Sequence, residues 1–124
     1  MEKKTEIIES LATVAARNDC ILVDTLAQGT VAHFGYLMEE LENGEEEIIL
    51  IALVQLFAKE MYWEGLALLT MAFSLREMYT ASEVVAAVGT TGDEHCMKKF
   101  LAIFLKGCEA KIEAIWEEHP GRLN

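Results

Sequence analysis

Apolar residues recur along this chain at the three- and four-residue spacing of amphipathic helices, and no segment alternates with the period of two that marks a strand. The first helical pattern opens near Thr5, and Asn18-Asp19 can end it. The second continues to Leu41, with a possible break at Gly29-Thr30. The pattern predicts a single all-α domain over residues 1–124, with six or seven helices packed as antiparallel helical hairpins.

Asn43 and Gly44 predict a helix boundary, because both residues tolerate the left-handed conformation that closes a helix. Glu45, Glu46 and Glu47 follow at once, and carboxylates are favourable beside the free amides and the dipole of a helix N-terminus. We therefore expect one helix to end before Gly44 and another to begin directly after it.

The helical pattern from Glu45 to Tyr79 is too long for one helix. A single helix of this length would span roughly 50 Å, more than a compact domain of this size allows, so we expect a break between Lys59 and Trp63. The sequence KEMY at residues 59–62 returns as REMY at residues 76–79. Two helix starts about seventeen residues apart match half of the roughly 34-residue tetratricopeptide period, and a chance repeat is the alternative.

Two later segments, Thr80-x-x-Glu83 and Thr91-x-x-Glu94, have the spacing of a capping box. They predict a short helix that Gly89 ends and a last, long helix that begins near Glu94. The apolar stripe of that last helix contains Met97, Phe100, Leu101, Phe104, Leu105, Cys108, Ile112 and Ile115.

Apolar residues make up 52% of the chain. The longest uncharged runs reach about half of the roughly 20 residues that a membrane span needs, so we expect a soluble protein. The apolar content exceeds what a thin helical chain buries by itself. We therefore expect some apolar surface to face a partner protein or a second copy in a homo-oligomer.

Acidic residues dominate the charge: 21 Asp and Glu stand against 10 Lys and Arg, which gives a net charge of −11. This charge disfavours direct binding to nucleic acid or to an anionic membrane, because phosphate contacts need clustered cations. Another protein, basic or helical, is the partner that it favours. The cysteines, Cys20, Cys96 and Cys108, lack a CxxC spacing, which favours reduced thiols and a cytoplasmic location.

The sequence contains no known catalytic or nucleotide-binding motif. The residues three positions before His33, His95 and His119 are not glutamates, so the Glu-x-x-His signature of di-iron bundles is missing. Cys20 follows Asp19, whose charge opposes the formation of a thiolate nucleophile. We therefore expect a non-enzymatic protein without a metal or another cofactor.

Three short elements follow one another in the chain: NDC at residues 18–20, GEEE at residues 44–47 and YWEGL at residues 62–66. Their order resembles that in small tetratricopeptide-like chaperones of type III secretion systems, which hold the needle subunit. The spacing between the first two elements is longer here than in this family, and the resemblance ends near residue 75. The chain also departs from the general tetratricopeptide pattern at Glu60, where a turn glycine is usual. It implies a tetratricopeptide-like chaperone with a helical partner in an apolar groove.

Two functional hypotheses follow. In the first, the protein is a chaperone or adaptor that holds its partner in an apolar groove around Phe57, Met61, Tyr62, Trp63 and Leu66. In the second, it is an acidic, phage-type inhibitor that mimics nucleic acid and blocks a basic nucleic-acid-binding protein through Glu39, Glu40, Glu45, Glu46 and Glu47. These glutamates otherwise form a solvated corner between two helices.

Overall fold

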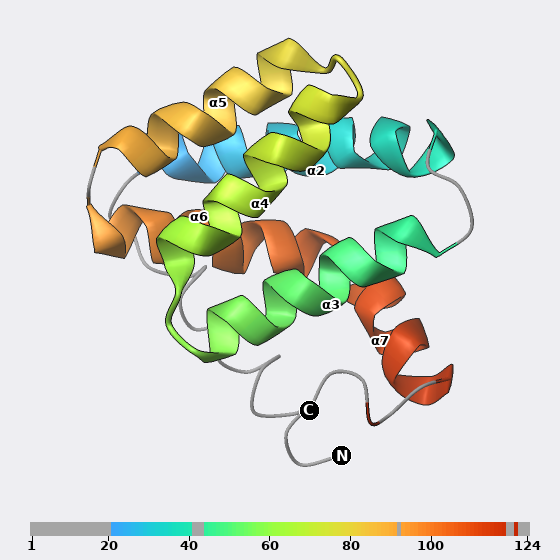
Figure 1. The fold of residues 1–124 in the computed structure, drawn as a ribbon. Coiled ribbons are helices and arrows are strands. Elements are labelled where there is room, and N and C mark those ends of the chain that lie inside the picture. Colours follow the sequence, from blue (N-terminus) through green and yellow to red (C-terminus); the bar gives the residue numbers. More distant parts are fainter. Residues whose placement is uncertain (1–20, 41–43, 92, 119–120, 122–124) are drawn as a thin grey trace.

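Six helices make up the described part of the chain, which the computed structural model gives for residues 21–40, 44–91, 93–118 and 121. No strand occurs within these ranges, so the expected all-α class is confirmed (Figure 1). The first expected helix, near Thr5, lies outside the described residues. The helices are α2 (Ile21–Glu40), α3 (Glu45–Ala58), α4 (Tyr62–Leu75), α5 (Tyr79–Thr90), α6 (Glu94–Gly107) and α7 (Glu109–Glu118).

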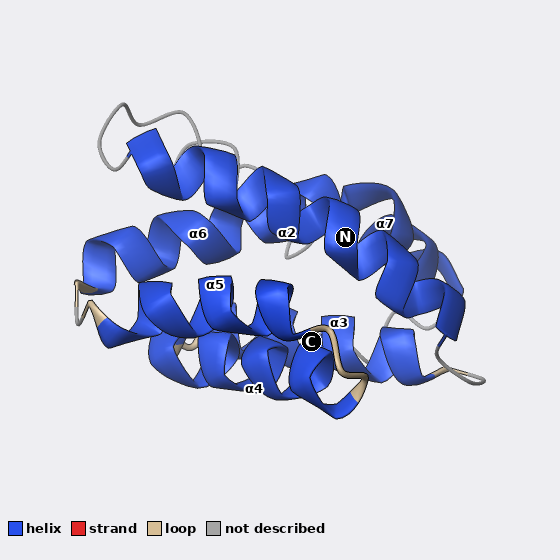
Figure 2. Ribbon diagram, turned by 90° about the horizontal axis from the view of Figure 1, so that it is seen from above, coloured by secondary structure: helices blue, strands red, loops and turns tan. Residues whose placement is uncertain are grey.

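The helices form two layers, which are seen edge-on in Figure 2. Helices α3, α4 and α5 follow one another as antiparallel neighbours in one layer, and α2 and α6 lie behind them (Figure 1). The closest packing joins α4 to α5 and α2 to α6, while α7 packs on α3 and α6. The predicted arrangement in helical hairpins is therefore observed, and α4 occupies the middle of the front layer.

The core lies between the two layers and is centred on α6. Helix α6 contacts every other described helix. It is therefore buried over most of its circumference, as expected for a central helix. Phe34 of α2 contacts two further aromatic rings, Phe73 of α4 and Phe104 of α6, both in edge-to-face geometry. These contacts connect the front layer to the back layer.

The turns before α4 and α5 repeat the same geometry seventeen residues apart. Glu60 and Glu77 both have φ of 60°. The amide of Met61 donates to the Leu56 carbonyl at 2.9 Å, and the amide of Met78 donates to the Phe73 carbonyl at 3.0 Å. This six-to-one hydrogen bond after a left-handed residue is the Schellman motif. The repeat of KEMY as REMY therefore encodes two equivalent helix-to-helix turns.

The left-handed glutamates give the first testable prediction. Because an L-residue with a side chain is less stable than glycine in this conformation, Glu60→Gly and Glu77→Gly should each raise the free energy of unfolding by about 1 kcal/mol. Urea unfolding followed by circular dichroism measures the change. Alanine at the same positions also removes the carboxylate but keeps the strain, so the alanine variants should show no such gain.

A glycine in an ordinary helical position is the matched control. Glu83 is exposed in the interior of α5, where Glu83→Gly should destabilise the protein by about 1 kcal/mol. Equal effects of glycine at positions 60, 77 and 83 would contradict the assigned turn geometry.

Local signals gave several helix boundaries correctly. Gly44 has φ of 79° and directly precedes α3, as predicted, while Asn43 lies outside the described residues. The break expected between Lys59 and Trp63 is also confirmed, because α3 ends at Ala58 and α4 begins at Tyr62. In both places a left-handed residue reverses the chain direction.

Three boundary predictions were wrong. No break occurs at Gly29-Thr30: the Thr30 hydroxyl donates to the Leu26 carbonyl at 2.8 Å inside the continuous helix α2. Thr80 lies within α5 and caps nothing, because the preceding turn places Met78 at the N-cap position. Asp93, not Thr91, caps α6 by accepting hydrogen bonds from the backbone amides of His95 and Cys96.

The expected last helix is divided into α6 and α7 at Cys108. The backbone amide of Cys108 is shared between the carbonyls of Phe104, at 3.2 Å, and Leu105, at 3.1 Å, which tightens the end of α6. The apolar stripe predicted for one helix is nevertheless buried on both sides of this break. No helix in the described ranges is long and apolar enough to cross a membrane.

Candidate functional site

The outward side of α4 is apolar, although this helix lies at the surface. Trp63, Met71 and Leu75 are 59%, 57% and 75% exposed, and the single charged residue of the helix is Glu64. The opposite side of α4 is buried through Leu69 and Phe73. A helix that is apolar on all sides is usually buried on all sides, so α4 has one face that this chain leaves uncovered.

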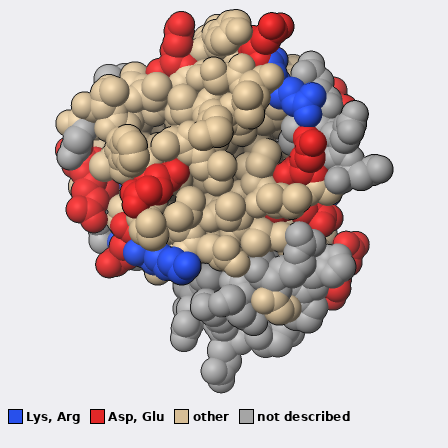
Figure 3. All heavy atoms as spheres, viewed as in Figure 1, with Lys and Arg blue, Asp and Glu red and all other residues tan. Residues whose placement is uncertain are grey.

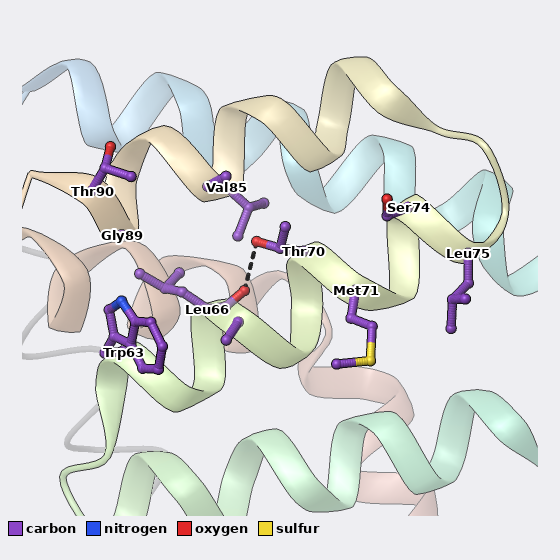
Figure 4. Close-up of a pocket in the computed structure, with 11 residues that line it drawn as sticks. Trp63, Leu66, Thr70, Met71, Ser74, Leu75, Val85, Gly89 and Thr90 are labelled. Carbon is purple, nitrogen blue, oxygen red and sulfur yellow. Dashed lines mark hydrogen bonds between the residues drawn. The ribbon is translucent and has the colours of Figure 1, made fainter.

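A groove of about 450 Å³ runs between α4 and α5 (Figure 4). We refer to it as the α4–α5 groove. None of its lining residues is charged. They are Trp63, Leu66, Ala67, Thr70, Met71, Ser74 and Leu75 from α4, and Val85, Ala86, Gly89 and Thr90 from α5.

Small residues keep the α4–α5 groove open. The lining includes the small residues Ala67 of α4 and Ala86 and Gly89 of α5, and the indole of Trp63 lies beside Gly89 at one end (Figure 4). A methyl group added at Gly89 would approach the indole only to 4.0 Å, so no steric overlap forces glycine there. The short side chains leave space above the helix backbones that a partner's side chains can fill.

One hydrogen bond joins the two walls of the groove, and a second lies within α4. The buried Ser82 hydroxyl of α5 donates to the Thr70 carbonyl of α4 at 3.2 Å. The Thr70 hydroxyl itself donates to the Leu66 carbonyl at 2.8 Å (Figure 4). Because these polar groups are satisfied internally, the groove presents mainly its apolar atoms.

A second hollow, of about 400 Å³, lies on the other side of α4 against α3. Its lining includes Ile48, which is exposed, together with Ile49, Ala72 and Leu75. Leu75 lines both hollows, so they adjoin at the C-terminal end of α4. The uncovered apolar surface therefore extends across α4 from α5 to α3.

The sequence hypothesis placed the groove on five residues, of which the structure brings Trp63 and Leu66 to the groove lining, although Leu66 is only 1% exposed. Met61 is 37% exposed on the turn before α4 and lies outside both hollows. Phe57 and Tyr62 require a correction, because both are buried. Their rings pack edge-to-face at 5.6 Å between centroids and join α3 to α4.

The Tyr62 side chain is buried, and its surroundings change the pKa of its hydroxyl. Burial raises the pKa of its hydroxyl, and the carboxylates of Glu60 and Glu94 raise it further. The Lys98 ammonium lies 5.8 Å from the centre of its ring, a cation–π distance. Tyr62 therefore anchors the start of α4 to α6.

Sequence reasoning missed Met71, Leu75 and the whole contribution of α5. One signal was present, since α4 contains only one charged residue in fourteen. A surface helix of a monomer normally carries a polar face. The lack of a polar face on α4 therefore indicated that this helix is covered by other protein surfaces on more than one side. The α5 residues carry no comparable signal.

Some glutamates of the acidic corner form ion pairs within the chain. We use this name for Glu39, Glu40, Glu45, Glu46 and Glu47. Glu45 pairs with Arg76 at 2.9 Å and Glu46 with Lys111 at 3.7 Å, which attaches the start of α3 to α4 and α7. Glu47 also has an interaction within the chain. Glu39 is exposed at the end of α2, and the side chain of Glu40 lies outside the description.

The remaining chemistry concerns the cysteines. Cys96 is disulfide-bonded, which corrects the expectation of reduced thiols at that position. Burial raises the pKa of the free Cys108 thiol to about 12, so it stays protonated at neutral pH and packs as a core residue. Within the described ranges, no group of three or more His, Cys, Asp or Glu side chains could hold a metal ion.

Comparison with known proteins adds no relative: no family model, curated protein or solved structure matches this chain.

Proposed function

We propose that this protein is a non-enzymatic binding module, a chaperone or adaptor, that holds another protein through the α4–α5 groove. The observation that carries the proposal is the apolar outer face of α4, with Trp63, Met71 and Leu75 exposed above a groove without a charged lining residue. An apolar surface of this kind marks an interaction site in a soluble protein.

The exposed apolar residues of α4 would contribute to binding a protein partner. Burying one large apolar side chain contributes about 1.5–3 kcal/mol, so these three residues offset part of the cost of association and the rest of the interface must supply the remainder. Trp63 is the natural anchor, because tryptophan is enriched among the residues that dominate binding energy.

The helix arrangement supports a tetratricopeptide-like function. Helices α3, α4 and α5 begin at residues 45, 62 and 79, a constant step that equals half of the roughly 34-residue tetratricopeptide period. Such repeats bind other proteins on surfaces formed by successive helices. Cytoplasmic location stays a prediction.

The acidic inhibitor is the weaker hypothesis. A surface that mimics nucleic acid needs unpaired carboxylates, whereas Glu45 and Glu46 are engaged with Arg76 and Lys111. Salt separates the two functions. Binding that rests only on exposed carboxylates should be lost as ionic strength rises, while binding that rests mainly on the apolar groove should weaken but persist, because only the charges are screened.

Site-specific photo-crosslinking tests the proposed function in the cells that naturally make the protein. A benzophenone amino acid at Met71 should capture a discrete protein partner. The same group at Tyr36, which is 65% exposed on α2, should not capture it. No captured protein at Met71, or the same capture at both positions, would refute the proposal.

The captured partner then gives a quantitative prediction. Trp63→Ala should raise the Kd of the purified complex at least tenfold and by up to about 30-fold, since an anchor of this kind contributes about 2 kcal/mol. Tyr36→Ala is the matched aromatic control and should leave the Kd unchanged. Titration calorimetry measures both, and equal effects would place the interface elsewhere.

A further inference from the structure

We propose that the occupant of the α4–α5 groove is an amphipathic helix of another protein, with an apolar stripe of about four turns and Lys or Arg residues at both ends of that stripe. This inference rests on the proposed function and specifies the class of partner. It is carried by the shape of the groove and by the distribution of charge around it.

The groove has the dimensions of a helix-binding site. Helix α4 contains 14 residues and is therefore about 21 Å long. It runs antiparallel to α5, and the groove between the two helices is lined partly by small residues, Ala67, Ala86 and Gly89 among them. Small side chains let a third helix approach to the usual axial separation of about 8–10 Å. Apolar residues at helical spacing on that helix then enter the groove.

Exposed carboxylates lie at both ends of α4. Glu60 precedes the helix and Glu77 follows it, in the two equivalent turns, and both side chains are exposed. Glu64 and Glu83 are further exposed acids on α4 and α5. Both turn positions favour glycine, so the chain keeps a carboxylate at each end of the groove against the local conformational preference.

Cations are scarce around the groove. Between residues 44 and 91 the sequence has seven glutamates and two cations, Lys59 and Arg76. Arg76 is already paired with Glu45 at 2.9 Å. On the face shown in Figure 3, uncharged atoms fill most of the centre, and acidic groups outnumber the basic groups that are visible around them. Charge complementarity therefore requires a partner that is apolar along its middle and basic at its ends.

The same charges argue against a second copy of this chain as the occupant. Each copy carries a net charge of −11 and would bring a second acidic margin against the first. Like charges placed opposite each other across an interface lower affinity. A small apolar molecule would fill the groove but would leave the carboxylates without a role.

Designed peptides test the proposal on the intact protein. Three labelled 18-residue peptides serve as probes: a leucine-striped helix with lysines at both ends, the same helix with glutamates at both ends, and a scrambled form of the lysine peptide. Fluorescence anisotropy gives each Kd at low and at physiological salt. The striped lysine peptide should bind at least tenfold more tightly than either of the others.

Variants assign the binding to the groove and to its two ends. Met71→Glu should abolish binding of the striped lysine peptide. The double variant Glu60→Lys/Glu77→Lys should weaken it about tenfold and strengthen binding of the glutamate peptide, because it reverses the charges at both ends. Glu117→Lys/Glu118→Lys on α7 makes the same change of net charge at exposed positions and should leave the preference intact.

The outcomes separate this inference from the proposed function. Equal binding of both striped peptides, lost in Met71→Glu, would overturn the basic partner and leave the protein-binding groove standing. Tight binding of the scrambled peptide would show that net charge alone is at work and would overturn the inference. A dimer in sedimentation experiments that Met71→Glu dissociates would identify a second copy as the occupant and would equally overturn it.

Discussion

Replacing Phe34 with alanine is expected to lower the free energy of unfolding by about 3–5 kcal/mol. Phe34 is fully buried on α2, and its ring centre lies 6.4 Å from that of Phe73 and 5.2 Å from that of Phe104. These partners belong to α4 and α6, so one side chain holds three helices and both layers. Its removal loses apolar burial and two edge-to-face contacts, each worth about 0.5–1.5 kcal/mol.

Urea unfolding monitored by circular dichroism measures this effect, with Tyr36→Ala as the control on the same helix. Tyr36 is exposed, so its truncation should change stability by about 0.5 kcal/mol or less. The loss expected for Phe34→Ala is a large part of the roughly 5–15 kcal/mol that stabilises a typical domain. Should Phe34→Ala not fold, the milder Phe34→Leu keeps the test quantitative. Similar effects at positions 34 and 36 would contradict the packing of α2.

Replacing Gly107 with alanine is expected to destabilise the protein by about 1–3 kcal/mol, although helix propensity alone favours alanine by about 1 kcal/mol. The reason is a tertiary contact between α6 and α2. A methyl group at position 107 would lie 2.6 Å and 2.9 Å from the two Cγ atoms of Val31 and 3.3 Å from its Cβ. A β-branched side chain in a helix has one strongly preferred rotamer, so Val31 cannot move aside cheaply.

The sign of the effect is what the experiment tests. Gly35→Ala on α2 is the control, because nothing lies within 4 Å of its added methyl group and the change should stabilise the protein by about 1 kcal/mol. Combining Gly107→Ala with Val31→Ala should recover most of the loss, beyond the cost of Val31→Ala alone. A strictly additive double-mutant cycle would show that the two residues are not in contact.

Helix boundaries were predictable where the backbone chemistry is local. Gly44 takes the position before α3 because glycine adopts positive φ at little cost, and Glu45–Glu47 suit the N-terminus that follows. The repeated KEMY and REMY turns were visible for the same reason. The false cap at Thr80 shows the limit: a Schellman turn leads directly into α5, so the helix begins before the threonine can cap it.

The groove was only partly predictable. Phe57, Tyr62, Trp63 and Leu66 are all apolar and lie close together in the sequence, yet Trp63 is exposed and the other three are buried. Hydrophobic periodicity assigns faces only when one face is polar. Because α4 has apolar residues on every side, its sequence could not indicate which side turns outward.

The sequence by itself determined the all-α class, the turns at Gly44 and at residues 59–61, and the acidic charge, because each depends on backbone preferences or on composition. Only the tertiary structure decided that Trp63, Met71 and Leu75 face outward and that α5 supplies the second wall of the groove. The packing of α5 and α6 against α4 decides which side of α4 faces outward. Helices α5 and α6 must each bury an apolar face, and α4 can turn only one of its sides toward them.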